Sequence, residues 1–259
     1  MFDCAYLIEI LTPLRSDQEN VEANMERFAG RYRRVMDSGC GLSIPDNPMG
    51  KPRYNALEAI DNCGLAIDPQ RMVMNLNTFH TKKELDAVLN RASSMGVKYL
   101  LVIRGDGGPD LSALDPQHIG GRKSVTTSID LIRYINTAYA DKFVTGAAFN
   151  PYKPIDFEIR RLQEKIAAGA KFVITQPIVG GDPNVDRLEN LGIPIVIEAW
   201  MSNNIGLLYR SVGKKTDASA EAYDPVKNLK VLHDAYPQNS VYLSMLSFKM
   251  DWKPILPKL

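Results

Sequence analysis

The segment IDFEIRRLQEKIAAGAKFVITQPI, residues 155–178, predicts one amphipathic helix followed by one buried strand. Ile159, Leu162 and Ile166 recur at helical spacing on one face, and Gly169 is a typical helix stop. The run at 172–178 is almost continuously hydrophobic, as in parallel strands that are buried on both faces. A helix that leads directly into such a strand is part of a repeating β/α arrangement.

The same alternation of buried strand and helix continues along the chain. Thr81 and Glu84 have the spacing of a capping box at the start of one helical segment. We expect strands at 5–11, 42–45, 72–77, 99–103, 143–149, 172–178, 194–200 and 241–248, and helices at 17–34, 81–96, 128–140, 155–169, 182–192, 204–213 and 225–235.

The number of units predicts the fold class. Eight strands in 259 residues give about 32 residues per strand, which is the size of a β/α unit. We therefore predict an α/β protein, a (β/α)8 TIM barrel that occupies residues 1–259 as a single domain. The alternative is an open, doubly wound sheet. No low-complexity tract or linker divides the chain.

Composition and charge argue against several classes of protein. Lys and Arg number 31 and Asp and Glu number 30, so the net charge of +1 does not favour a nucleic-acid partner. Hydrophobic runs such as 99–103 are far too short to span a membrane. Asp3 and Glu9 interrupt the hydrophobic N-terminal stretch, so we expect no signal peptide.

The cysteines and histidines are dispersed along the sequence. No CxxC spacing occurs and the number of cysteines is odd, so we expect reduced thiols in a cytoplasmic protein. Neither residue type shows the spacing of metal ligands, and we predict no metal site. The residues concerned are Cys4, Cys40, Cys63, His80, His118 and His233.

Polar residues at the ends of the expected strands are the candidates for chemistry, because barrel enzymes place their sites there. Glu9 lies among apolar residues, where burial would raise its pKa and suit a general acid; the alternative is a structural salt bridge. Asp106 projects from a glycine-rich turn. Gln176 suits a hydrogen bond to a heterocycle or a role in a structural network. Asp46, Asn75, Asn77, Glu198 and Lys249 also lie at or near strand ends, where turn, capping or solvated roles are alternatives.

Five segments together resemble one protein family. They are YLIEILTP at 6–13, LSIPDNPMG at 42–50, VIRGD at 102–106, GAAFNP at 146–151, and LQEKIAAGA at 162–170 with ITQ at 174–176. This set resembles the methylenetetrahydrofolate reductases, which are flavoproteins with a (β/α)8 barrel. The matches extend from residue 6 to about residue 180, and the last pair is the most specific.

The resemblance implies reduction of 5,10-methylenetetrahydrofolate to 5-methyltetrahydrofolate through FAD, with NAD(P)H as electron donor, in the one-carbon metabolism that supplies methionine. By resemblance, Glu9 is the acid that opens the five-membered ring, Asp106 acts beside flavin and pterin, and Gln176 contacts the pterin. Ile205 occupies the position that stacks on folate. The positions that resemble flavin contacts are Asn75, Arg104, Gly105, Asp106, Ala147, Phe149, Glu158 and Lys165.

Several positions depart from the family pattern. Asn75 replaces a histidine, Pro45 a threonine, Phe149 a tyrosine and Ile205 a phenylalanine. The arginine expected near the end of the last strand is either replaced by Phe248 or shifted to Lys249. Because more of these changes fall on the flavin side, two alternatives stay open. One is a folate-dependent methyltransferase that works with a corrinoid protein in demethylation. The other is a flavin-free family member that takes electrons from a partner protein, or a non-catalytic subunit that keeps the barrel and binds another reductase component. A homo-oligomer is compatible with each alternative.

Overall fold

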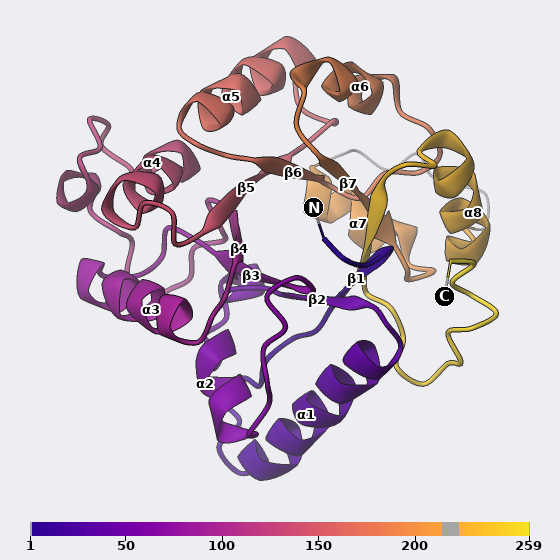
Figure 1. Ribbon diagram of the computed structural model, residues 1–259, viewed down its shortest axis with the longest axis horizontal. Coiled ribbons are helices and arrows are strands. Elements are labelled where there is room, and N and C mark those ends of the chain that lie inside the picture. Colours follow the sequence, from indigo (N-terminus) through magenta and orange to yellow (C-terminus); the bar gives the residue numbers. More distant parts are fainter. Residues whose placement is uncertain (1, 214–222, 259) are drawn as a thin grey trace.

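The computed structural model describes residues 2–213 and 223–258. Its parallel strands close into a barrel in sequence order, and β8 pairs with β1 (Figure 1). This closure confirms the predicted (β/α)8 fold and excludes the open sheet. The extent of the domain, residues 1–259, stays a prediction. The strands are β1 (Tyr6–Glu9), β2 (Gly41–Ile44), β3 (Met72–Leu76), β4 (Tyr99–Val102), β5 (Val144–Phe149), β6 (Phe172–Thr175), β7 (Ile195–Trp200) and β8 (Ser240–Ser244).

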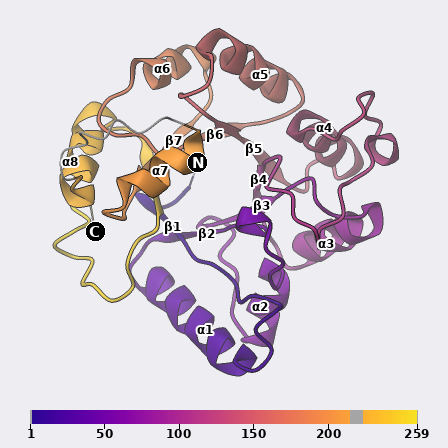
Figure 2. The same ribbon diagram turned by 180° about the vertical axis from the view of Figure 1, so that it is seen from behind.

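Helices follow the strands and surround them, as the views from opposite sides show (Figures 1 and 2). The α-helices are α1 (Val21–Asp37), α2 (Ala56–Asn62), α3 (Lys82–Ser94), α4 (Ser128–Ala138), α5 (Ile155–Ala167), α6 (Pro183–Asp186), α7 (Ile205–Val212) and α8 (Pro225–Ala235). Short 3-10 helices lie at η1 (Pro48–Gly50), η2 (Pro116–Ile119) and η3 (Arg187–Leu191). None of the helices in the described part of the chain is long and apolar enough to cross a membrane.

Local sequence signals explain where α3 begins. The Thr81 side chain accepts a hydrogen bond from the Glu84 amide at 3.3 Å, and the Glu84 carboxylate accepts one from the Thr81 amide at 2.7 Å. This is the capping box predicted from the spacing, and it satisfies two amides that the helix itself leaves unpaired.

The structure differs from the expected elements at α2, at residues 182–192 and at the end of β8. Helix α2 was not predicted, although Asn55 and Glu58 form a capping box at its start; it has only seven residues, too few for a clear helical period. The helix expected at 182–192 is divided into α6 and η3. The last strand was predicted to reach residue 248 but ends at Ser244, because Met245 adopts a left-handed conformation with φ of 61°.

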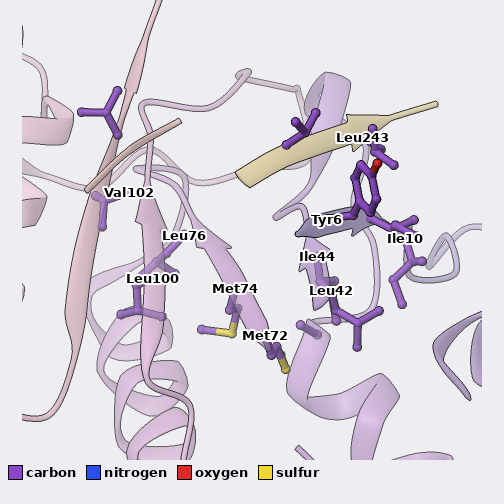
Figure 3. Packing of buried hydrophobic residues seen from close by; sticks show 14 of the residues in the cluster. Tyr6, Ile10, Leu42, Ile44, Met72, Met74, Leu76, Leu100, Val102 and Leu243 are labelled. Carbon is purple, nitrogen blue, oxygen red and sulfur yellow. The ribbon is translucent and has the colours of Figure 1, made fainter. Parts of the chain in front are cut away.

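Two hydrophobic layers stabilise the barrel. The larger one lies between strands and helices and contains Leu42, Met74 and Leu243, among the residues labelled in Figure 3. The smaller one contains side chains that alternate with these along the strands and therefore fill the interior: Leu7, Val73, Tyr99, Leu101, Phe172, Ile174, Val196 and Tyr242.

Phe2 closes the interior layer at the end of the barrel where the strands begin. Its ring packs edge-on against Tyr99 and Phe172, with centroid distances of 4.6 and 5.4 Å. Inward-facing residues beyond this layer therefore face the opposite end, where the strands terminate. This end of the barrel, which we call the mouth, is where barrel enzymes place their active sites.

Candidate active site

Glu9 and Tyr242 form a buried acid pair at the mouth. Glu9 is the last residue of β1 and lies two positions beyond Leu7, so it shares the inner face with that residue. The Tyr242 hydroxyl donates a hydrogen bond to Glu9 Oε2 at 2.7 Å. Burial raises the pKa of Glu9, and this effect exceeds the opposing effects of Tyr242, the Met245 amide and the charge of Arg53. Glu9 therefore keeps its proton to a higher pH than an ordinary glutamate.

A second buried carboxyl group lies on β7, the strand next to the Tyr242 strand β8. Glu198 of β7 is only 8% exposed and pairs in register with Tyr242 of β8. Burial raises the pKa of Glu198 well above its ordinary value; a hydrogen bond from Ser244 opposes the shift and the charge of Glu9 adds to it. Within residues 2–213 and 223–258, no ion pair includes either glutamate.

Polar contacts continue from these acids toward β3. Glu9 pairs in register with Ser43 of β2, and the Ser43 hydroxyl donates to Asn75 Oδ1 at 3.3 Å. Asn75 is 7% exposed, so its amide is held in place rather than solvated. The sequence analysis selected Glu9 and Asn75 separately. In the barrel, Ser43 lies between them: it pairs in register with Glu9 and hydrogen-bonds to Asn75.

A buried ion pair joins the loops that follow β2 and β3. Asp46 Oδ2 accepts hydrogen bonds from His80 Nε2 at 2.6 Å and from the Asn77 amide at 2.9 Å. Burial lowers the pKa of His80, but the hydrogen bond and charge of Asp46 outweigh burial, so the net shift is upward. The sequence analysis gave His80 no role, and no sequence signal connects it with Asp46, 34 positions away.

Asp106 lies on the rim of the mouth, in the loop after β4. Its Oδ2 accepts a hydrogen bond from the Met49 amide at 2.9 Å, and its side chain is exposed. The preceding Gly105 has φ of 77°, and a Cβ there would lie 2.6 Å from Asn77 Cβ, so any other residue would be strained. The side chain of Arg104 is also exposed. The sequence-predicted group at 104–106 therefore lies together on this rim.

The remaining flavin-type positions gather around β5 and α5. The Lys165 ammonium is buried and donates to the Ala148 carbonyl at 2.7 Å. Burial lowers the pKa of Lys165, while the charge of Glu158 opposes that shift. The side chains of Ala147 and Phe149 are fully buried in the layer between strands and helices, so they can offer a ligand only their backbone.

Gln176 and Ile205 lie near the ends of β6 and β7. The backbone N–H of Gln176 donates to the Phe149 carbonyl at 2.6 Å, and the Gln176 side chain is half-buried. Ile205 begins α7 and packs with Trp200 and Leu208 in a separate apolar cluster. Trp200 lies two residues beyond Glu198 on the same strand, so this cluster adjoins the inner face of the mouth.

The predicted residues share one end of the barrel but form several distinct groups. No hydrogen bond among the described residues joins Glu9 directly to Asp106 or to Gln176. A cavity of about 520 Å³ lies beside α2 and α3. Its lining includes His80 and the strand-end candidate Asp46, but none of the residues that the resemblance assigns to folate or flavin. The mouth is thus defined by strand ends and not by this cavity.

A closed parallel barrel with acids, amides and cations at the ends of its strands has the organisation of a (β/α)8 barrel enzyme. Residues 26–196 match the sequence model of the methylenetetrahydrofolate reductases, and the chain belongs to this family.

Curated relatives share part of this sequence. Methylenetetrahydrofolate reductase 1 of Schizosaccharomyces pombe is 34% identical over 133 residues, which are 46% of this chain and 21% of that protein. Methylenetetrahydrofolate reductase 2 of Saccharomyces cerevisiae is 29% identical over 124 residues, 43% of this chain and 20% of that protein. The matches therefore cover about a fifth of the length of these relatives.

Solved structures resemble the chain in fold alone. The structure of 2,3-dimethylmalate lyase aligns with a TM-score of 0.53 at 10% identity and covers 93% of this chain and 74% of that one. An oxaloacetate acetylhydrolase aligns with a TM-score of 0.51 at 12% identity and covers 95% and 76% of the two chains. Both support the barrel assignment.

Proposed function

We propose that the protein binds a reduced folate in the mouth and reduces 5,10-methylenetetrahydrofolate to 5-methyltetrahydrofolate. Family membership supports this reaction. The observation that carries the proposal is the acid at the end of β1, where burial raises the pKa of Glu9 and Tyr242 holds its carboxyl group. A protonated carboxyl group at neutral pH is what opening of the five-membered ring requires.

Glu9 would donate its proton to the nitrogen that leaves the methylene carbon. The ring then opens to an iminium, which is the form that accepts a hydride. The Tyr242 hydroxyl, 2.7 Å from Glu9 Oε2, would stabilise the carboxylate that remains after proton transfer. The two side chains thus divide proton donation and charge stabilisation between neighbouring strands.

Other residues of the mouth would hold the folate. The carboxylate of Asp106 suits the N–H donors of a pterin, and its bond to the Met49 amide fixes its position. The amide of Gln176 can donate and accept hydrogen bonds at a heterocycle edge. Ile205, within its apolar cluster, would pack against the aromatic part of the substrate.

The residues around β4 and β5 fit an FAD. Lys165 is a buried cation with three N–H donors, one of which bonds to the Ala148 carbonyl of β5. Arg104 is an exposed cation just beyond the end of β4, the strand that pairs with β5. Gly105 allows the backbone to approach a ligand closely. Arg104 and Lys165 would hold the diphosphate, whereas Glu158 could only accept hydrogen bonds from donor groups elsewhere on the FAD, and the Asn75 amide would be a further polar contact. When bound, FAD supplies hydride transfer, and we propose NAD(P)H as its donor.

Two measurements test this function. The purified protein, reconstituted with FAD, should show flavin absorbance and oxidise NAD(P)H when methylenetetrahydrofolate is present. Glu9→Gln should slow folate turnover about a hundredfold while NAD(P)H still reduces the flavin at nearly the original rate.

The exposed Glu189 provides the matched control, Glu189→Gln, which should leave both rates unchanged. Equal losses in the two half-reactions of Glu9→Gln would exclude the acid role. Folate turnover by protein that retains no flavin would support the flavin-free alternative instead, and absence of both flavin binding and turnover would refute the proposal.

A further inference from the structure

Glu198 is a buried carboxyl group that the proposed proton transfer does not use. Its backbone is fixed on both sides: the Glu198 amide donates to Thr175 Oγ1 at 3.0 Å, and its carbonyl accepts from the Ile178 amide at 3.1 Å. With 8% of its surface exposed, the residue has little freedom to turn toward bulk solvent. Its side chain is therefore held at the mouth.

Among residues 2–213 and 223–258, the groups found to act on Glu198 are acidic or neutral. Residues paired in register on neighbouring strands share a face, so Glu198 lies beside Tyr242, which in turn is bonded to Glu9. The charge of Glu198 also acts on Tyr152, and Ser244 hydrogen-bonds to its carboxyl group. Among the described residues no Lys, Arg or His forms an ion pair with it.

A buried carboxylate without a cation costs several kcal/mol, and such a group keeps its proton instead. Burial raises the pKa of Glu198, in agreement with this geometry, and the charge of Glu9 raises it further once Glu9 has lost its proton. A protonated carboxyl group differs from a carboxylate in one decisive way: it can donate a hydrogen bond.

We infer that Glu198 remains a neutral carboxylic acid and donates a hydrogen bond to an acceptor atom of the heterocycle bound in the mouth. A ring carbonyl or an unprotonated ring nitrogen has the required chemistry. The donor role rests on the proposed folate function, whereas the protonation of Glu198 does not. Glu198 is thus a substrate-positioning residue that complements the proton donor Glu9.

Protonation is tested first, on the unaltered protein. In protein with 13C-labelled glutamate carboxyl groups, NMR at pH 7 should show carboxyl signals at the protonated position, and one of these should disappear in Glu198→Gln. The exposed Glu189→Gln is the matched control and should remove none of them. If every glutamate carboxyl of the unaltered protein is ionised at pH 7, the inference is wrong, whether or not the protein binds folate.

The donor role is tested by calorimetry with folic acid as the probe. Glu198→Gln keeps an N–H donor and should bind within about threefold of the original affinity, whereas Glu198→Met has a similar volume without a donor and should bind about tenfold more weakly. Binding to the original protein should weaken at alkaline pH as Glu198 ionises, and this decrease should be smaller in Glu198→Gln, in which only Glu9 of the two buried carboxyl groups can still ionise.

Failure of the donor role of Glu198 can be distinguished from failure of the proposed folate function. Unchanged affinity in a folded Glu198→Met would overturn the inference and leave the proposed function intact. Absence of folic acid binding to the original protein at every pH would overturn the folate function together with the donor role. Circular dichroism verifies that each variant is folded.

Discussion

The ion pair between Asp46 and His80 gives the sharpest prediction about stability. The two side chains are 9% and 11% exposed, and Asp46 also accepts a hydrogen bond from the backbone N–H of Asn77. Removing the charge from one member of a buried pair costs about 3–5 kcal/mol. Asp46→Asn keeps the size of the side chain and one acceptor oxygen. We therefore expect a loss at the lower end of this range, a decrease of about 3 kcal/mol in the unfolding free energy at pH 6.

The cost should depend on pH in a defined direction. The pKa of His80 is raised in the folded protein despite burial, because Asp46 stabilises its cation. This contribution is fully present below the unfolded pKa of about 6.5 and is lost as the pH rises through the folded pKa. The difference in unfolding free energy between the original protein and Asp46→Asn should therefore be largest at pH 6. It should fall to about 1 kcal/mol at pH 9, where His80 is neutral and the two proteins differ only in hydrogen bonds that join no pair of opposite charges.

Urea unfolding at both pH values measures these differences, and NMR titration of His80 measures its pKa directly, which should fall in Asp46→Asn. The control is Asp61→Asn, which breaks the exposed pair with Arg91 at 2.5 Å and should cost less than 1 kcal/mol. The reasoning is refuted if Asp46→Asn costs no more than the control, or if its cost is the same at pH 6 and pH 9.

Further predictions concern the backbone and a helix terminus. Gly105→Ala should lower the unfolding free energy by about 2 kcal/mol more than the control Gly64→Ala. Both glycines have positive φ, but of the two only Gly105 would place a Cβ against a neighbour, 2.6 Å from Asn77 Cβ. Equal losses in the two variants would contradict this steric argument. Thr81→Ala should cost about 1 kcal/mol in urea unfolding through loss of the α3 cap, and a loss below 0.3 kcal/mol, roughly, would show that the capping bonds contribute little.

Much of the fold could be predicted because its signals are local. Continuous hydrophobic runs located every strand, helical spacing located α3 and α5, and the helices expected at 128–140 and 225–235 match α4 and α8 to within a few residues. The errors occurred where the local signal was weak or absent. Helix α2 is too short for a clear period, and the positive φ of Met245, which ends β8, leaves no mark in the hydrophobic pattern.

The sequence alone determined the alternation of strands and helices, and it placed Glu9 and Asp106 at strand ends. Only the tertiary structure decided which of these groups act together. Closure of the barrel brings Tyr242 to Glu9 across 233 positions and sets Glu198 beside that pair. The physical reason is that hydrophobic periodicity is a property of neighbouring residues, whereas the pKa of a carboxyl group depends on burial and on charges that only strand register and closure bring near it.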